Sequence, residues 1–343
     1  MKNINDLIRP HLKGLKPYSS ARDEYVGEAS AWLDANESPL DNGINRYPDP
    51  YQTRIKEFLA KKSNINVDQI LVGNGSDEVI DLLFRAFCEP GADNIIINPP
   101  TYGMYKVSAD INGISYKEVP LNEDFSLNPS KILSNIDGNT KMIFICSPNN
   151  PTGNIMNYDD ISTIASGFNG LVIVDEAYID FTQKNSWINS LDKFSNIVVI
   201  QTLSKSYSAA GLRVGFLYAN PEVIAILNKI KPPYNVNALS QKAALEVLQN
   251  EDVNKKVLDD IQSEKIRVKT ALENMDLIKK IYPSDANFWL VQVDDANEVY
   301  EKLINKGVVV RNRSTQLNCE NTLRLTVGNK TENDLLITEL KKI

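Results

Sequence analysis

Three short, uninterrupted apolar runs constrain the fold of this chain more than any other feature. They cover residues 142–146, 171–174 and 197–200, and most of their residues are β-branched. A strand with one wet face alternates polar and apolar residues, whereas runs of this kind are typical of strands buried on both faces of a parallel sheet. The sequence therefore predicts an α/β fold whose buried strands are covered by helices.

Composition limits the classes of function. The chain has 343 residues, of which 42% are hydrophobic and 24% charged, so it is long enough for two folded domains. Its net charge of -7 argues against a nucleic-acid partner, because phosphate backbones need a basic face. No apolar run approaches the roughly 18 residues that cross a membrane. The three cysteines lack CxxC spacing, so we expect a reducing cytoplasm, no disulfide and no metal site.

Two adjacent prolines, Pro232 and Pro233, mark a shift from strand-rich to helix-rich sequence. We expect an N-terminal arm over residues 1–30, a large domain over 31–235 and a small α+β domain over 236–343. The small domain is predicted to contain helices at 238–248 and 253–275 and strands at 288–293, 308–311 and 322–327.

Lys205 follows the third apolar run in a polar turn of small residues, and Arg213 lies eight residues further on. Open α/β sheets bind ligands at the carboxyl ends of their strands. A lysine in such a crevice loses hydration, so its neutral amine becomes more favourable and can attack a carbonyl to form a Schiff base. The alternative is a solvated surface lysine. Because His11 is the only histidine, acid-base chemistry must fall to Lys, Asp, Glu or Tyr.

Polar residues also end the other two runs. Asp175 follows one of them, and a buried carboxylate there needs a cationic partner, which is either a basic side chain or a protonated ligand nitrogen. The chain lacks GxxxxGK[ST], which excludes a P-loop ATPase.

Asn150 lies in a loop that two prolines constrain. Tyr102, in a Pro-Pro-Thr-Tyr-Gly loop, could stack on a planar ligand or simply pack against the protein.

A glycine turn at residues 73–78 precedes a helical apolar pattern. The free amides at Ser76 and Asp77 could bind a phosphate, provided that the carboxylates of Asp77 and Glu78 point away; a capped helix without a ligand is the alternative. Arg311 and Arg324 lie on apolar strands, where each needs a carboxylate or a phosphate from the protein or from a ligand.

Taken in order, these motifs resemble the fold-type I pyridoxal-phosphate-dependent aminotransferases over nearly the whole chain. The resemblance rests on residues 73–77, Tyr102, 150–153, 175–178, 204–205, Arg213 and Arg324. Residues 33–37, 46–49 and 323–328 resemble the branch of that family that acts on histidinol phosphate. The resemblance implies a large domain with a mainly parallel sheet flanked by helices, a smaller α+β C-terminal domain, and a homodimer with shared active sites.

The resemblance also implies roles around pyridoxal phosphate. Lys205 would bond to the cofactor and carry a proton, and Asp175 would pair with the ring nitrogen. Tyr178 and Asn150 would hydrogen-bond the ring oxygen, and Tyr102 would stack on the ring. The cofactor phosphate would be held by Ser76, Asp77, Thr202, Ser204, Arg213 and, from the partner subunit, Tyr47.

The implied reaction is transamination between histidinol phosphate and 2-oxoglutarate, which yields imidazole acetol phosphate and glutamate in histidine biosynthesis. Arg324 would bind the glutamate α-carboxylate, with Arg311, Tyr18 and Asn36 as further substrate contacts. Asn312 stands where the family often has Asp, and we assign no role to Arg313. The alternatives are an aromatic amino-acid aminotransferase and a pyridoxal-phosphate-dependent decarboxylase of phosphorylated amino acids. A non-catalytic regulator would need a DNA-binding segment, and none is evident.

Overall fold

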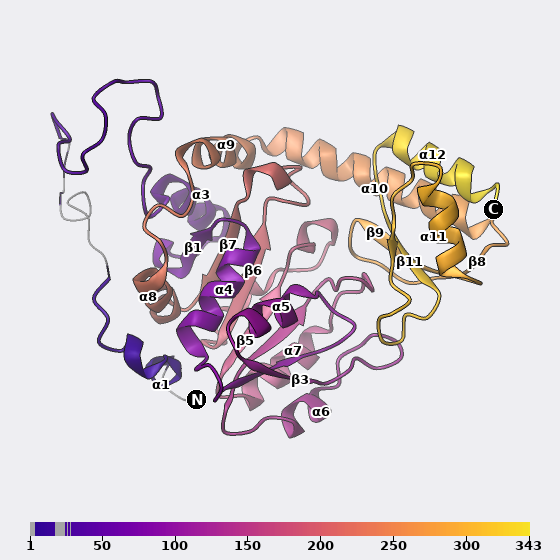
Figure 1. The fold of residues 1–343 in the computed structure, drawn as a ribbon, viewed down its shortest axis with the longest axis horizontal. Coiled ribbons are helices and arrows are strands. Elements are labelled where there is room, and N and C mark those ends of the chain that lie inside the picture. The colour runs from indigo at the N-terminus through magenta and orange to yellow at the C-terminus, as the bar shows by residue number, and fades with distance from the viewer. Residues whose placement is uncertain (1–3, 18–24, 26, 28) are drawn as a thin grey trace.

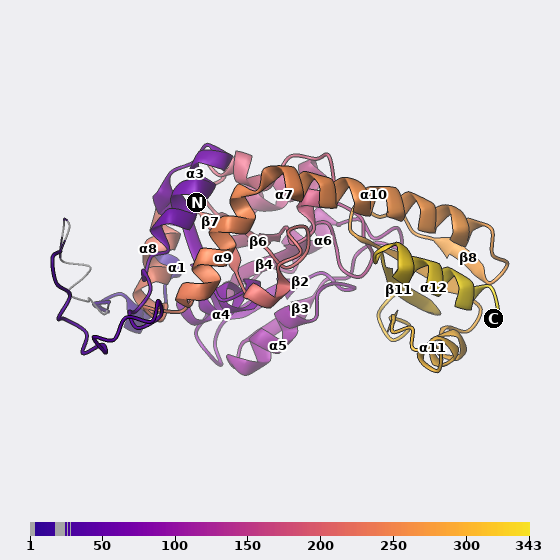
Figure 2. The same ribbon diagram turned by 90° about the horizontal axis from the view of Figure 1, so that it is seen from above.

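The computed structural model describes residues 4–17, 25, 27 and 29–343, and these form two sheet-containing parts that lie side by side (Figure 1). The larger part contains a seven-stranded sheet and the smaller part a four-stranded sheet. Helix α10 (Glu251–Glu273) runs along one side from the large part to the small one (Figure 2). None of the helices in the described ranges is long and apolar enough to cross a membrane.

The large sheet has the strand order β1-β7-β6-β5-β4-β2-β3. The neighbours from β6 to β3 pair in parallel, whereas β7 is antiparallel to both β6 and β1. The predicted α/β fold with a mainly parallel sheet is therefore confirmed. The strands are β1 (Ile70–Gly73), β2 (Asn94–Ile97), β3 (Ser115–Glu118), β4 (Thr140–Cys146), β5 (Leu171–Asp175), β6 (Ile197–Thr202) and β7 (Gly215–Ala219).

Helices cover both faces of this sheet, which explains the uninterrupted apolar runs. Along β5, Leu171 and Ile173 pack in one core, whereas Val172 and Val174 pack in the other. Each such side chain contributes about 1.5–3 kcal/mol when it is buried, so neither face of a central strand can be polar. The Leu171 face packs with α4 (Ser76–Phe87), α5 (Met104–Ile111) and α8 (Pro221–Ile230); the other packs with α3 (Thr53–Ser63), α6 (Pro129–Ser134), α7 (Tyr158–Gly167) and α9 (Ala238–Gln249).

The small sheet is antiparallel, with the order β10-β11-β9-β8. Its strands are β8 (Ile278–Ile281), β9 (Phe288–Val293), β10 (Arg311–Asn312) and β11 (Thr322–Thr326), and they pack against α10, α11 (Ala296–Ile304) and α12 (Lys330–Leu340). The predicted strand at 308–311 was wrong in its extent. Residues 308–310 do not pair with β11; Val310 is buried in the small core while Val309 is 79% exposed, so the apolar residues there pack without forming a strand.

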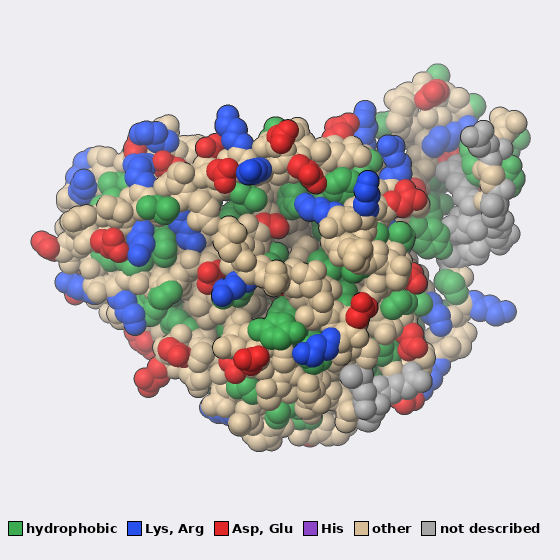
Figure 3. All heavy atoms as spheres, turned by 180° about the vertical axis from the view of Figure 1, so that it is seen from behind, with side chains coloured by type: hydrophobic (Ala, Val, Ile, Leu, Met, Phe, Trp, Pro, Cys, Tyr) green, Lys and Arg blue, Asp and Glu red, His purple; other side chains and the backbone are tan. Residues whose placement is uncertain are grey.

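The beginning of the described chain packs on the large part. Helix α1 (Ile4–Leu7) and a 3-10 turn at Pro10–Leu12 bury Ile4, Leu7 and Leu12, while Arg9 Nε donates to Glu89 Oε2 at 3.2 Å. The described residues of 30–52 form no helix or strand and extend away from the sheet (Figure 1). Acidic and basic side chains are intermixed on the face in Figure 3, which shows no continuous basic surface.

Candidate active site

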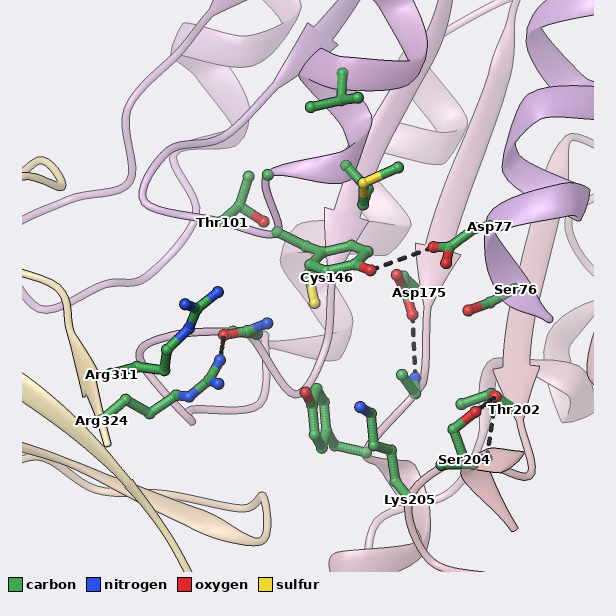
Figure 4. Close-up of a pocket in the computed structure, with 18 of the residues that line it drawn as sticks. Ser76, Asp77, Thr101, Cys146, Asp175, Thr202, Ser204, Lys205, Arg311 and Arg324 are labelled. Carbon is green, nitrogen blue, oxygen red and sulfur yellow. Dashed lines mark hydrogen bonds between the residues drawn. The ribbon is translucent and has the colours of Figure 1, made fainter. Parts of the chain in front are cut away.

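A cavity of about 530 Å³ lies between the carboxyl ends of the central large-sheet strands and strands β10 and β11 of the small part (Figure 4). Parallel strands end at one edge of a sheet, so the polar residues that follow β4, β5 and β6 converge there. The structure places twelve of the sequence-predicted site residues in the wall of this cavity: Ser76, Asp77, Tyr102, Asn150, Asp175, Tyr178, Thr202, Ser204, Lys205, Arg213, Arg311 and Arg324.

Lys205 projects into the cavity from the turn after β6 (Figure 4). Its Nζ lies 5.8 Å from the centre of the Tyr178 ring. Burial lowers the pKa of Lys205, and the nearby Arg324 guanidinium lowers it further, against the opposing effect of Asp175. The neutral amine is therefore more accessible than in a surface lysine, as a nucleophile requires.

Asp175 ends β5 and is 3% exposed. Its Oδ1 accepts a hydrogen bond from the Ala177 amide at 3.1 Å, and its Oδ2 accepts one from the Tyr105 hydroxyl at 2.7 Å. Burial raises the pKa of Asp175, since these two donors offset only part of the lost hydration. Within the described residues, no lysine or arginine forms an ion pair with it. A buried carboxylate of this kind suits a protonated ligand nitrogen.

Helix α4 begins against the loop that carries Arg213, and glycines make this close approach possible. Gly75 has φ +80°, and a Cβ there would lie 2.6 Å from Arg213 Nη2. A Cβ on Gly215 would overlap the Ser76 backbone nitrogen. Arg213 itself adopts a left-handed backbone conformation, φ +54°, that non-glycine residues avoid unless the surroundings hold them in it. The start of α4 and the Arg213 guanidinium therefore lie side by side, an arrangement of amides and positive charge that suits an anion.

The condition set for a phosphate site, that both acidic side chains of this turn point away from it, is not met by Asp77. Its Oδ1 accepts a hydrogen bond from the Tyr102 hydroxyl at 3.2 Å, and its Oδ2 lies 3.6 Å from Arg213 Nη2. These two partners draw the carboxylate into the cavity wall. Glu78 does turn away, where it accepts from the Asn74 amide and the Asn235 side chain.

The remaining polar residues of the cavity come from the turn after β6 and from the small sheet. Thr202 Oγ1 donates to Ser204 Oγ at 2.9 Å. Arg311 and Arg324 are direct partners in the β10–β11 pairing, and Arg324 Nη1 donates to Asn150 Oδ1 across the boundary between the two parts. Asn150 is thus held by the small part of the protein rather than only by its own prolines.

Several residues of the site were missed by the sequence analysis. The cavity is also lined by Arg313 and Gln316, and Tyr105 supports Asp175 from behind. Arg313 carried a weak signal, because it stands two residues after Arg311, just beyond the end of a strand whose side chains alternate between faces. Tyr105 carried no such signal, since a tyrosine on an amphipathic helix is typical of a core residue.

Two of the predicted residues do not line this cavity in the described chain. Tyr47 and Asn36 line a separate surface pocket, in which the Tyr47 ring stacks on Tyr234 with 4.5 Å between the ring centres. The Tyr47 side chain is half exposed there. Tyr18 lies outside the described residues.

The lysine after β6, the acid at the end of β5 and the start of α4 beside Arg213 all line one cavity at the carboxyl edge of the sheet. Residues 23–340 match the family model for aminotransferase class I and II. A histidinol-phosphate aminotransferase from Christiangramia forsetii is 54% identical over 343 residues, which cover 99% of this chain and 98% of that one. The chain therefore belongs to the class I and II aminotransferases and, among them, to the histidinol-phosphate aminotransferases. This confirms the family predicted from the sequence.

Solved structures support the same fold. A histidinol-phosphate aminotransferase from Clostridium acetobutylicum has a TM-score of 0.80 at 24% identity and covers 87% of this chain and 90% of its own. One from Sinorhizobium meliloti, in complex with pyridoxal-5'-phosphate, has a TM-score of 0.79 at 22% identity over 87% of this chain and 82% of its own. The predicted fold class is thereby confirmed.

Proposed function

We propose that the protein uses pyridoxal phosphate to transfer an amino group between histidinol phosphate and 2-oxoglutarate, giving imidazole acetol phosphate and glutamate. One observation carries the proposal beyond family membership. Lys205 shares its cavity with a small-part wall that bears Arg311 and Arg324. Histidinol phosphate carries a dianionic phosphate and 2-oxoglutarate carries two carboxylates, and guanidinium groups are suited to bidentate contacts with both groups.

The residues present fit pyridoxal phosphate. The cradle of the Ser76 and Asp77 amides with Arg213 suits its phosphate, together with Thr202 and Ser204. Asp175, which lacks a cationic partner in the described chain, suits its ring nitrogen. We assign Tyr178 and Asn150 to the ring oxygen and Tyr102 to the ring face. When bound, pyridoxal phosphate supplies an electrophilic carbonyl and a ring that accepts electrons.

Lys205 has two tasks in this assignment. Its neutral amine would bond to the cofactor's carbonyl carbon with loss of water and so hold the cofactor in place. With substrate bound, the freed Nζ would accept the proton from the substrate α-carbon and return it. The lowered pKa of Lys205 favours both tasks, because each needs an amine with a free electron pair.

Arg324 and Arg311 bind the anionic end of the substrate in this scheme, so that its α-carbon lies beside Lys205. Tyr18 and Asn36 are proposed as further substrate contacts. Because Asn36 and Tyr47 lie outside the cavity of their own chain, we propose that a second copy of the chain brings them to it. The active unit is then a homodimer in which Tyr47 contacts the partner's cofactor phosphate.

All three cysteines are free and buried, which suits the reducing cytoplasm.

The proposed substrate is tested by the half-reaction of purified holoenzyme with single amino donors. Histidinol phosphate, phenylalanine and O-phosphothreonine are each mixed with enzyme, and the cofactor absorbance is followed. We expect histidinol phosphate to show the largest kcat/KM, with no carbon dioxide released. A preference for phenylalanine would identify an aromatic aminotransferase, and carbon dioxide from the phosphorylated amino acid would identify a decarboxylase.

A further inference from the structure

The small sheet directs three arginines toward the same cavity. Arg311 on β10 pairs directly with Arg324 on β11, and Arg313 follows two residues after Arg311, where its amide donates to the Thr322 carbonyl at 2.9 Å. Residues opposite each other, and residues two apart along a strand, share a face of the sheet. All three side chains therefore line the cavity that contains Lys205.

This group of cations has no neutralising acid in the described part of the chain. None of the three guanidinium groups forms a salt bridge there, and the Nε atoms of Arg313 and Arg324 are buried without a hydrogen-bond partner. The two acids in the cavity are engaged elsewhere, Asp77 with Tyr102 and Asp175 with Tyr105. Like charges that face one another across a sheet destabilise it, so this arrangement costs folding free energy.

Arg313 is the most constrained of the three. Burial, and then the charges of Arg324 and Arg311, lower the pKa of Arg313 to about 10. The turn that follows it adds two more buried polar atoms without partners, Ser314 Oγ and Gln316 Oε1. Three of the seven such atoms in the described residues belong to residues that line the Lys205 cavity, namely Arg313, Gln316 and Arg324, whereas Ser314 lines a neighbouring cavity. Buried polar groups without partners are rare, and their concentration on one wall indicates that a ligand satisfies them.

We propose that Arg313 is a third cationic substrate contact, which makes the site selective for substrates that carry two negative charges. The proposal rests on the proposed function, in which a phosphate monoester and a dicarboxylate occupy the site in turn. Arg324 Nη1 already donates to Asn150, so part of the hydrogen-bonding capacity of that guanidinium group is occupied. Arg313 supplies the additional donors that a dianion needs and a single carboxylate does not.

The test uses holoenzyme and glutarate, a dicarboxylate that has no keto or amino group and so binds without reacting. The affinity for glutarate and the melting temperature are measured for the wild type and for Arg313→Gln. We expect the variant to bind glutarate about tenfold or more weakly, because charged hydrogen bonds are lost, and its ligand-free melting temperature to be no lower. Butyrate, which carries one charge, should lose much less affinity. KM for 2-oxoglutarate should rise more than kcat falls.

The matched control is Arg267→Gln, which removes an arginine that pairs with Glu264 and Asp334 on the surface of the small part. It should leave glutarate binding unchanged. Arg313→Lys keeps the positive charge but loses the paired guanidinium donors. It should retain the fold and bind glutarate more weakly than the wild type. Unchanged glutarate affinity in Arg313→Gln, or a marked fall in ligand-free melting temperature in both Arg313 variants, would overturn the proposal in favour of a structural arginine.

Failure of this proposal is distinguishable from failure of the proposed function. If the wild type uses histidinol phosphate but Arg313→Gln binds glutarate normally, the function stands and the role of Arg313 does not. If the wild type does not use histidinol phosphate while Arg313→Gln loses glutarate affinity, the dianion contact stands and the substrate assignment is wrong.

Discussion

The hydroxyl of Tyr105 donates a 2.7 Å hydrogen bond to Asp175 Oδ2, and both side chains are almost completely buried. The Tyr105 ring stacks on Phe144 with 4.8 Å between ring centres and meets the edge of Tyr102 at 5.6 Å. One phenol therefore fixes the orientation of the carboxylate and also supports the aromatic ring on the adjacent wall of the cavity.

Tyr105→Phe should weaken cofactor binding without changing the packing of the ring. Asp175 would lose a hydrogen bond to its ionised form, and such bonds contribute about 1.5–3 kcal/mol, so we expect the cofactor Kd to rise roughly tenfold or more. Equilibrium dialysis of the apoenzyme with pyridoxal phosphate measures this. Tyr158→Phe, which removes the surface contact of Tyr158 Oη with Ser190 Oγ, is the control. An unchanged Kd for Tyr105→Phe would contradict a positioning role.

Lys205→Ala should fold and bind cofactor but hold it only non-covalently. Turnover should fall by several orders of magnitude, because both the nucleophilic amine and the proton carrier are lost. Borohydride reduction followed by peptide mass spectrometry measures the linkage directly. We expect the wild-type cofactor to remain on the peptide that contains Lys205 and the variant to release it on denaturation. Normal visible absorbance of lysine-linked cofactor in the variant would show that another residue forms the bond.

Active sites shared between two subunits should allow complementation. In a heterodimer of Lys205→Ala with Tyr47→Phe, one site carries both substitutions and the other carries neither. We expect activity near that of one wild-type site at limiting cofactor, where the Tyr47 contact matters most. Heterodimers isolated through two different affinity tags provide the measurement. If verified heterodimers show no recovery, Tyr47 does not serve the partner's site.

Arg311→Leu should lower kcat/KM for the two amino donors unequally. Loss of one partner of a charged pair costs about 2–4 kcal/mol, so kcat/KM for histidinol phosphate should fall by roughly 30-fold to 900-fold. Glutamate should lose much less, because Arg324 still holds its α-carboxylate. Steady-state kinetics with both donors decide this. Equal losses for the two would place Arg311 away from the substrate phosphate.

Glu176 should make stability depend on pH. It is buried, it accepts hydrogen bonds from Ser186, Trp187 and Gln201, and burial raises its pKa from 4.5 to about 7. The folded protein therefore binds this proton more tightly than the unfolded chain does. The resulting stability is fully present below about pH 4.5 and is lost as the pH rises through 7.

Glu176→Gln, which cannot ionise, should gain stability relative to the wild type as the pH rises from about 5 to about 8. Thermal unfolding of both proteins across this range measures the difference, and the contributions of all other titrating groups cancel in it. Parallel curves for the two proteins would mean that Glu176 does not titrate in this range.

The sequence by itself determined the central strands and the residues that follow them. Apolar runs at 142–146, 171–174 and 197–200 report burial on both faces, which is a local property of each segment. Because parallel strands end at one edge, the position of Asp175 and Lys205 in one cavity followed from that pattern alone. The edge strand β3 was different: it went unpredicted because its residues are at least partly exposed and its composition is mixed.

Tertiary structure alone decided which way side chains turn within the site. Asp77 enters the cavity because Tyr102 and Arg213 come from distant segments to meet it. Tyr105 hydrogen-bonds Asp175 from 70 residues away in the sequence, and Arg313 lines the cavity where its amide bonds to the Thr322 carbonyl. Local periodicity reports whether a residue is buried. Which side chain a buried residue contacts depends on packing between segments far apart in the chain. This packing is set only when the whole sheet has formed.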